Sequence, residues 1–163
     1  PIIFSYLKDR LDRIEVLQEG KSYSVGNVTF TTPVRHLHRV ETYGLVFKTA
    51  KHTFSLITDT SYFDGLHQNY GGELLIMNVA FLEPRSRNQD PLLPADHLSV
   101  PDAERLIREL KPKVAILSHF GMTMWRAKPR EIAKQLSKQT GVRVIAAQDG
   151  MKFDLSRLDS NEL

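Results

Sequence analysis

Six histidines are present in the sequence, and two of them, His36 and His38, form a pair shortly after a predicted strand at residues 28–32. Residues two apart in an extended chain point to the same side, so both rings could face one site. Imidazole nitrogen is a common ligand of first-row divalent metal ions. The pair therefore indicates either a metal site or two solvated histidines on a loop.

Two further polar side chains follow apolar strands. Asp59 directly follows the strand predicted over residues 53–58, and His119 follows an apolar run at residues 114–117 with one serine between. Side chains at such strand ends emerge at the edge of a sheet, where groups from several strands can converge on a cleft. A plain turn remains the alternative for Asp59, whereas the position of His119 is more typical of a ligand or a catalytic base than of a core residue.

His97 lies just before a helix whose first turn is well marked. Ser99 is a suitable N-cap, Asp102 completes an approximate capping box, and Pro101 lies in the first turn. A histidine near the positive end of a helix dipole can act as a general acid. His97 is therefore a candidate catalytic residue, and an ordinary loop position is the alternative.

The chain contains no cysteine, which excludes disulfide scaffolds and thiolate metal sites. Any metal must then be held by histidine and carboxylate, which suit Zn²⁺, Mn²⁺ and Fe²⁺. An aspartate can also bridge two ions, and two ions about 3.5–4 Å apart form a hydrolytic site. The histidines and Asp59 at the strand ends match this chemistry.

The elements that must position these residues divide the chain into a strand-rich first half and a second half that alternates helix and strand. Strands are predicted over residues 13–17, 23–25, 28–32, 43–49, 53–58 and 74–81. Apolar residues at positions 103, 106, 107 and 110 follow a helical repeat, and a second helix begins at Pro129 and ends near Gly141. Short apolar runs at 114–117 and 142–146 predict buried strands. This order predicts an α/β fold, a mixed β-sheet with helices on one face.

Composition limits the size and class of the protein. The 163 residues, 41% hydrophobic and 25% charged, suit one domain or about half of a larger one. No apolar run approaches the roughly 20 residues that a membrane-spanning helix needs, and no signal-peptide pattern opens the sequence, so we expect a cytoplasmic protein and no membrane partner. The 22 basic and 19 acidic residues are mixed along the chain, and a net charge of +3 does not favour nucleic acid.

Over roughly residues 20–155, the order of these segments resembles the C-terminal half of a metallo-β-lactamase-fold hydrolase. His38, six residues before Gly44, is similar to a family histidine that binds metal ahead of a glycine-containing strand. The LITDT segment at residues 56–60 resembles the family's GDT segment, with threonine in place of glycine. The LSHF segment at residues 117–120 resembles the LTHF segment that carries the last metal-binding histidine.

A fourth segment, Asp96-His97-Leu98-Ser99 followed by Asp102, resembles a segment of the tRNA-processing ribonuclease Z branch. In that branch the histidine assists proton transfer to the leaving group. The overall likeness is to prokaryotic metal-dependent hydrolases of the superfamily.

The resemblance implies a metal-dependent hydrolase in which metal-bound hydroxide attacks an ester or phosphodiester-type bond. Asp59 would bridge two ions, His38 and His119 would each hold one, and His36 is an alternative ligand or a supporting group. His97 would protonate the leaving group. The expected cofactor is a pair of zinc ions, with manganese or iron as alternatives, and the expected substrate is a small molecule or a phosphodiester.

The sequence departs from the family in lacking its first motif, His-x-His-x-Asp-His. No histidine precedes His36, and three or four ligands cannot close two metal sites. The αββα sandwich of the family contains two similar halves. We therefore expect residues 1–163 to form a single C-terminal half domain, inactive alone, whose N-terminal half lies in the same protein or in a second chain. A homo-oligomer is another way to cover the open apolar sheet face.

Two other functions stay open. A ribonuclease Z-like nuclease would use His97 together with basic residues such as Arg126, Lys128 and Arg130, and a non-catalytic interaction module would reuse the half fold. Trp125, close after His119, either walls a substrate pocket or packs in the core.

Overall fold

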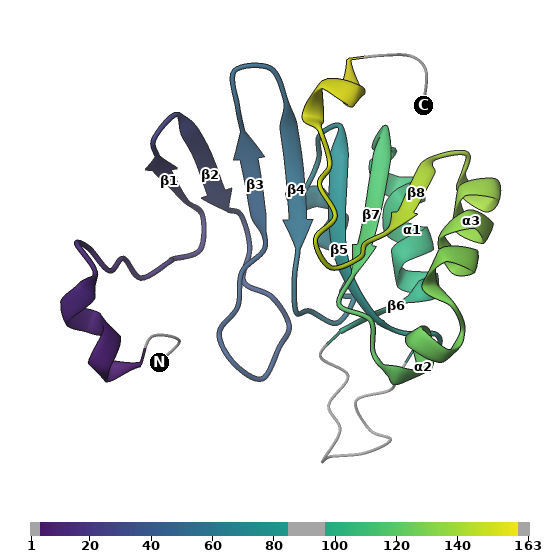
Figure 1. Ribbon diagram of the computed structural model, residues 1–163, viewed down its shortest axis with the longest axis horizontal. Helices are drawn as coiled ribbons and strands as arrows, with labels where there is room; N and C mark the ends of the chain where they lie inside the picture. Colours follow the sequence, from purple (N-terminus) through teal and green to yellow (C-terminus); the bar gives the residue numbers. More distant parts are fainter. Residues whose placement is uncertain (1–3, 85–96, 160–163) are drawn as a thin grey trace.

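The computed structural model describes residues 4–84 and 97–159, and within them eight strands form one sheet (Figure 1). Their order is β1-β2-β3-β4-β5-β7-β8, and the short β6 pairs with β5. The strands are β1 (Lys21–Val25), β2 (Val28–Thr32), β3 (Leu45–Lys48), β4 (Thr53–Ile57), β5 (Leu74–Phe81), β6 (Leu98–Ser99), β7 (Val114–Ser118) and β8 (Arg143–Ala146). The helices are α1 (Val100–Leu110), α2 (Met122–Arg126) and α3 (Pro129–Thr140), with 3-10 turns η1 (Ser5–Arg10), η2 (Leu66–Asn69) and η3 (Leu155–Leu158).

The sheet is mixed, as the sequence predicts. The three pairs among β1, β2, β3 and β4 are antiparallel. The pairs β4–β5, β5–β7, β7–β8 and β5–β6 are parallel. The parallel strands therefore end at one edge, the lower edge in Figure 1, where α2 and β6 also lie. Asp59, which follows β4, and His119, which follows β7, therefore lie at this edge.

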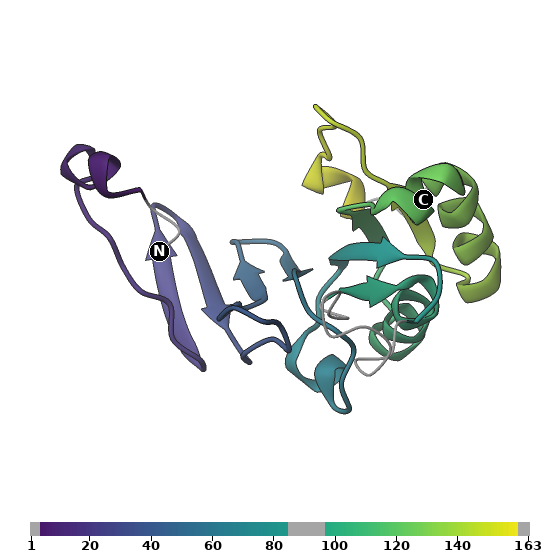
Figure 2. The same cartoon turned by 90° about the horizontal axis from the view of Figure 1, so that it is seen from below.

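Helices α1 and α3 cover one face of the sheet. The β5 side chains Leu75 and Met77 point to this face and are at most 2% exposed, because alternate residues of a strand face opposite sides. The helices bury their apolar stripes against them, at positions 103, 106 and 107 of α1 and 132, 133 and 136 of α3. Figure 2 shows the helices grouped beside β5, β7 and β8, with β1 and β2 at the far end of the sheet. The predicted α/β fold with helices on one face is confirmed.

Capping fixes where α1 begins. The Ser99 hydroxyl accepts the Asp102 N–H, and the Ser99 N–H donates to Asp102 Oδ2 at 2.9 Å, which together form the predicted capping box. Helix α3 stops at Gly141, whose φ of 73° is readily adopted only by glycine.

None of the helices in residues 4–84 and 97–159 is long and apolar enough to cross a membrane.

The opposite face of the sheet carries a row of aromatic side chains. Tyr23, Phe30, Phe47 and Phe54 are cross-strand neighbours from β1 to β4, with successive ring centroids 5.3, 5.7 and 4.8 Å apart. Farther along this face, Leu158 of η3 is fully buried against Leu74, Val114 and Ile116. The cluster around Leu158 also contacts Phe54, the member of the aromatic row on β4, and all four rings of the row are half-buried.

The structure differs from the prediction in two segments, and a third segment lies outside the described residues. Residues 13–17 are not a strand: Ile14 is 46% and Val16 74% exposed, because their apolar side chains find no neighbouring strand to pair with. Helix α2 is not predicted by the sequence, since it is five residues long and has no side-chain cap. Residues 85–96, which include Asp96 and most of the loop expected at 83–91, lie outside the described residues.

His36 ties the segment before β3 to the end of β4. The side chain is buried, its Nδ1 contacts the Thr58 carbonyl oxygen, and its Nε2 lies 2.5 Å from the Tyr70 hydroxyl oxygen. Because a carbonyl only accepts, Nδ1 carries the hydrogen and Nε2 accepts from Tyr70. Burial lowers the pKa of His36 to about 4. Gly44 lies directly against both rings, where a Cβ would fall on the Tyr70 hydroxyl and 2.7 Å from His36 Nε2.

The substitution Gly44→Ala is expected to destabilise the protein by about 1–3 kcal/mol, because the added methyl group must displace two buried side chains. Gly71→Ala is the matched control, since a Cβ there meets nothing within 4 Å. Urea denaturation of both variants measures the difference. Equal stabilities for the two variants would show that the contact with His36 and Tyr70 does not require glycine at position 44.

The His36 contact also predicts a pH dependence. An unfolded histidine has a pKa of about 6.5, so between pH 6.5 and 4 the unfolded state binds more protons than the folded state. This contribution to stability is complete above pH 6.5 and is lost as the pH falls through 4, by about 3 kcal/mol in all. Urea denaturation of wild type and His36→Gln, with a chelator present, should show the larger acid loss in wild type. The same loss in both proteins would argue against a buried neutral His36.

Candidate metal centre

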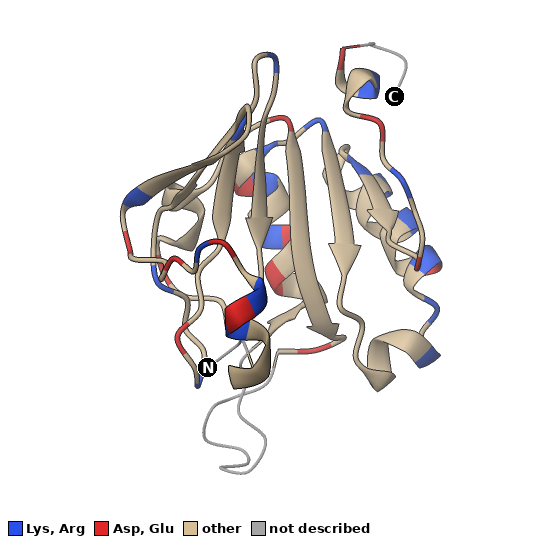
Figure 3. Cartoon of the chain, turned by 60° about the vertical axis from the view of Figure 1, so that its left-hand side comes forward, with Lys and Arg blue, Asp and Glu red and all other residues tan. Residues whose placement is uncertain are grey.

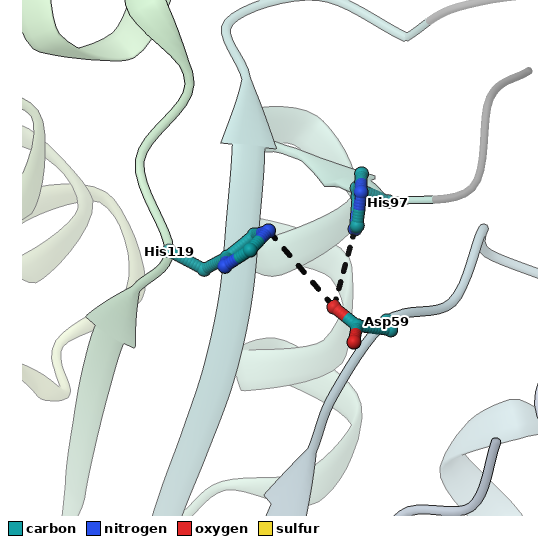
Figure 4. Close-up of side chains that lie close together, drawn as sticks. All are labelled: Asp59, His97 and His119. Carbon is teal, nitrogen blue, oxygen red and sulfur yellow. Dashed lines mark ion pairs between the residues drawn. The ribbon is translucent and has the colours of Figure 1, made fainter. Parts of the chain in front are cut away.

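Three side chains that are far apart in the sequence, Asp59, His97 and His119, meet at the edge of the sheet where the parallel strands end (Figure 4). Asp59 Oδ1 lies 3.5 Å from His97 Nδ1 and 4.0 Å from His119 Nε2. One ligand atom from each residue can be chosen so that all lie within 4.8 Å of one another. The strand ends therefore converge as their positions in the sequence suggest.

The sheet register brings these residues together. Ile57 of β4 and Leu117 of β7 both pair with Met77 of β5, so Asp59 and His119 follow at matching heights on either side of β5. His97 is placed by β6, whose Leu98 pairs with Val79, two residues beyond Met77 along β5. Adjacent strands are about 4.8 Å apart, which lets side chains that lean over the end of β5 meet.

Asp59 and His119 both have a left-handed backbone, with φ of 35° and 58°. Such angles are uncommon for residues other than glycine and cost about 1–3 kcal/mol where the surrounding structure imposes them. At both positions the chain leaves a parallel strand and turns sharply, and the side chain is turned towards the cluster. The same backbone conformation thus orients both side chains at the end of β5; Lys111 and Lys128 adopt it elsewhere in the described chain.

A chain of hydrogen bonds fixes the Asp59 carboxylate. Ser118 Oγ lies 3.0 Å from Asn78 Oδ1 and donates to it, and Asn78 Nδ2 donates to Asp59 Oδ1 at 3.0 Å. Because a carboxylate only accepts, the amide nitrogen of Asn78 must face Asp59, which leaves the amide oxygen to accept from Ser118. Such supporting bonds orient the carboxylates of metal sites. The sequence gives no signal for the role of Ser118, which depends on its pairing with Asn78 in neighbouring strands.

His38 lies beside the cluster, with its ring centroid 5.7 Å from that of His97. Its loop is held in place by two bonds: the Leu37 N–H donates to Thr60 Oγ1 at 3.1 Å, and the Ser61 N–H donates to the Leu37 carbonyl at 3.1 Å. These bonds join the loop of His38 to the turn that carries Asp59. His38 is thus positioned next to the three converging side chains.

The structure does not bring His36 to this cluster. The His38 N–H donates to the His36 carbonyl at 3.1 Å, so the chain bends between the two residues instead of staying extended. The two rings consequently face different surroundings, and both nitrogens of His36 are engaged by Thr58 and Tyr70. The contacts give His36 a structural role, and the period-two argument fails because it assumed an extended segment.

The residues that converge fit a divalent metal ion. Their side chains are accessible, with Asp59 35%, His97 23% and His119 53% exposed. One carboxylate oxygen and imidazole nitrogens, with no cysteine in the chain, are the donor set that zinc, manganese or iron accepts. Phe81 adds an apolar wall, its ring centroid 6.1 Å from that of His97.

Comparisons with known proteins agree with this architecture. Residues 2–120 match the sequence model of a family described as the beta-lactamase superfamily domain. The uncharacterized protein MJ1374 of Methanocaldococcus jannaschii is 27% identical over 159 residues, which cover 94% of this chain and 56% of that protein. The metallo-β-lactamase-fold protein YhfI of Bacillus subtilis superposes with a TM-score of 0.68 at 20% identity, over 83% of this chain and 53% of YhfI.

A diphosphatase of the PhnP family superposes with a TM-score of 0.59 at 18% identity, over 83% of this chain and 46% of that structure. The chain thus spans about half the length of the proteins it matches. The resemblance predicted from the four motifs is confirmed: the chain has a metallo-β-lactamase fold and belongs to the beta-lactamase superfamily.

Proposed function

We propose that this chain supplies part of the active site of a metal-dependent hydrolase. The observation that carries the proposal is the convergence of Asp59, His97 and His119 within 4.8 Å at the edge where the parallel strands end. Membership of a superfamily whose structural neighbours include a diphosphatase supports hydrolysis as the reaction. An ester or phosphodiester-type bond in a small molecule is the proposed target.

Asp59 and His119 are the proposed metal ligands from the ends of β4 and β7, and His38 is the proposed ligand from the loop before β3. Zinc is the proposed metal, with manganese or iron as alternatives, and Asp59 would lie between two ions. When bound, such an ion acidifies water to a pKa of about 7 and neutralises negative charge that develops on the substrate.

Side chains of this protein orient the metal ligand and supply the proton for the reaction. Asn78 and Ser118 hold the Asp59 carboxylate in one orientation. The carboxylate therefore loses little conformational freedom when the metal binds. His97, with Nδ1 3.5 Å from Asp59, is the proposed proton donor to the leaving group. If His97 instead binds metal, the metal content of a His97→Gln variant will fall along with its activity.

Further ligands must come from outside these residues if two ions are bound. Asp59, His38, His97 and His119 offer at most four side chains, fewer than two closed coordination shells require. We place the remaining ligands in another part of the same protein or in a second chain. The row Tyr23, Phe30, Phe47 and Phe54 is the proposed surface on which that part packs.

A nuclease is the less favoured reading of the same chemistry. The net charge is only +3, and Figure 3 shows basic and acidic segments interspersed on the side seen there rather than a basic stripe. A non-catalytic module is less favoured still, because it gives no reason for one carboxylate and two imidazoles to converge within 4.8 Å.

Asp59→Asn is expected to lower zinc affinity strongly, because it removes the charged ligand while keeping the shape of the side chain. Asn78→Ala, which removes only the support, should weaken zinc binding by about 10–100-fold. His67→Gln is the matched control, since His67 pairs with Glu109 away from this edge. Titration calorimetry of the full chain with zinc measures all three, and unchanged binding in Asp59→Asn would refute the site.

RNA binding tests the nuclease alternative. We expect weak binding of a short RNA duplex with little dependence on salt, since the charges are mixed. A steep fall in affinity between low and physiological salt, measured by fluorescence anisotropy, would instead indicate several phosphate contacts and favour a nuclease.

A further inference from the structure

A groove of about 770 Å³ lies between α2, the start of α3 and the end of β8, and its lining includes Phe120, the residue after His119. Its apolar lining includes Phe120, Trp125 and Ala147, and its charged lining includes Lys128 and Arg130. Grooves that bind small molecules typically have volumes of about 300–1,000 Å³ and are mostly apolar with a few polar groups. The size and lining suit part of an organic substrate.

The groove begins one residue away from a proposed metal ligand. Phe120 follows His119 directly, and the next residue, Gly121, packs against β5, with its N–H 3.2 Å from the Ala80 carbonyl oxygen. A Cβ on Gly121 would lie 2.5 Å from that oxygen, so the close approach depends on glycine. This tight turn positions α2, whose Trp125 lines the groove.

Trp125 faces outwards from α2. It is 66% exposed, whereas Met124, its neighbour in the chain, is fully buried and holds α2 on the core. The alternative that Trp125 packs in the core is therefore wrong. An exposed indole that lines a groove offers a flat surface for another ring, and aromatic pairs stabilise by about 0.5–1.5 kcal/mol beyond the area they bury.

The charges in the groove balance. Lys128 and Arg130 are matched by Glu131 and Asp149, which also line it. A polyanion would meet two carboxylates together with the two cations, so the lining does not favour a phosphate chain. It favours a ring without formal charge, held by stacking and by hydrogen bonds to its polar substituents.

We propose that this groove is a substrate subsite that binds an uncharged planar aromatic ring stacked on Trp125. The assignment of the ring to a substrate rests on the proposed hydrolase function. The affinity of the groove for such a ring is independent of that function, because none of the residues that line the groove is a proposed metal ligand.

Phenol, cyclohexanol and phenyl phosphate are the probes. Trp125 is the only tryptophan in the chain, so its indole N–H gives one NMR signal that reports on the groove in the metal-free full chain. We expect a saturable shift with phenol, about fivefold weaker binding of cyclohexanol, which cannot stack, and no gain for phenyl phosphate. No shift with phenol, equal binding of cyclohexanol, or tighter binding of phenyl phosphate would each overturn the proposal.

Variants on α2 provide the second test, read out on the phenol ring protons by saturation transfer. Trp125→Ala should weaken phenol binding about fivefold, and Trp125→Phe should keep it within about twofold. Met122→Ala is the matched control, because Met122 is equally exposed at 66% on the same helix but is not part of the lining. Unaltered binding in Trp125→Ala, with circular dichroism showing the fold intact, would refute the stacking role.

The two proposals fail separately. If phenol binds as described but Asp59→Asn leaves zinc binding unchanged, the groove remains a ring-binding site and the hydrolase proposal fails. If zinc binding depends on Asp59 but phenol does not bind, the hydrolase proposal remains and the groove assignment is wrong.

Discussion

The parallel pairing of β4 and β7 with β5 is the constraint on which the candidate metal centre depends. Because Ile57 and Leu117 share a partner on β5, the residues that follow them reach the same edge at the same height. Helices α1 and α3 stabilise this arrangement by burying one face of the three strands. Without the common register, Asp59 and His119 would be separate turn residues with no shared chemistry.

The edge of the sheet is shaped by close approaches that leave little freedom. Asp59 and His119 adopt left-handed backbones, Gly121 contacts β5 through its backbone, and Gly44 packs against His36 and Tyr70. Each of these features costs conformational freedom and is held by neighbouring bonds and packing. Rigid support of this kind keeps side chains near the geometry that a metal ion requires, and it also determines where the adjoining groove lies.

The two faces of the sheet differ in what covers them. One face has a continuous core with α1 and α3, while the other carries the aromatic row of β1 to β4, of which only Phe54 packs against the cluster around Leu158 of η3. The chain spans about half of its relatives. The half-buried aromatic row and the small number of ligands in the cluster are the two observations that support the proposal of a further structural layer on this face.

The sequence by itself determined the elements with local signals: the capped start of α1, the glycine end of α3, the buried parallel strands and the polar residues at their ends. It also indicated the family, because short motifs keep their order along the chain. Tertiary structure decided which histidines meet Asp59. A bend between His36 and His38 directs them to different surroundings, and Ser118 acquires a role only because β7 lies beside Asn78. Local patterns report on neighbours in the chain, whereas convergence, burial and the groove at Trp125 depend on strand register and helix packing, which no local pattern contains.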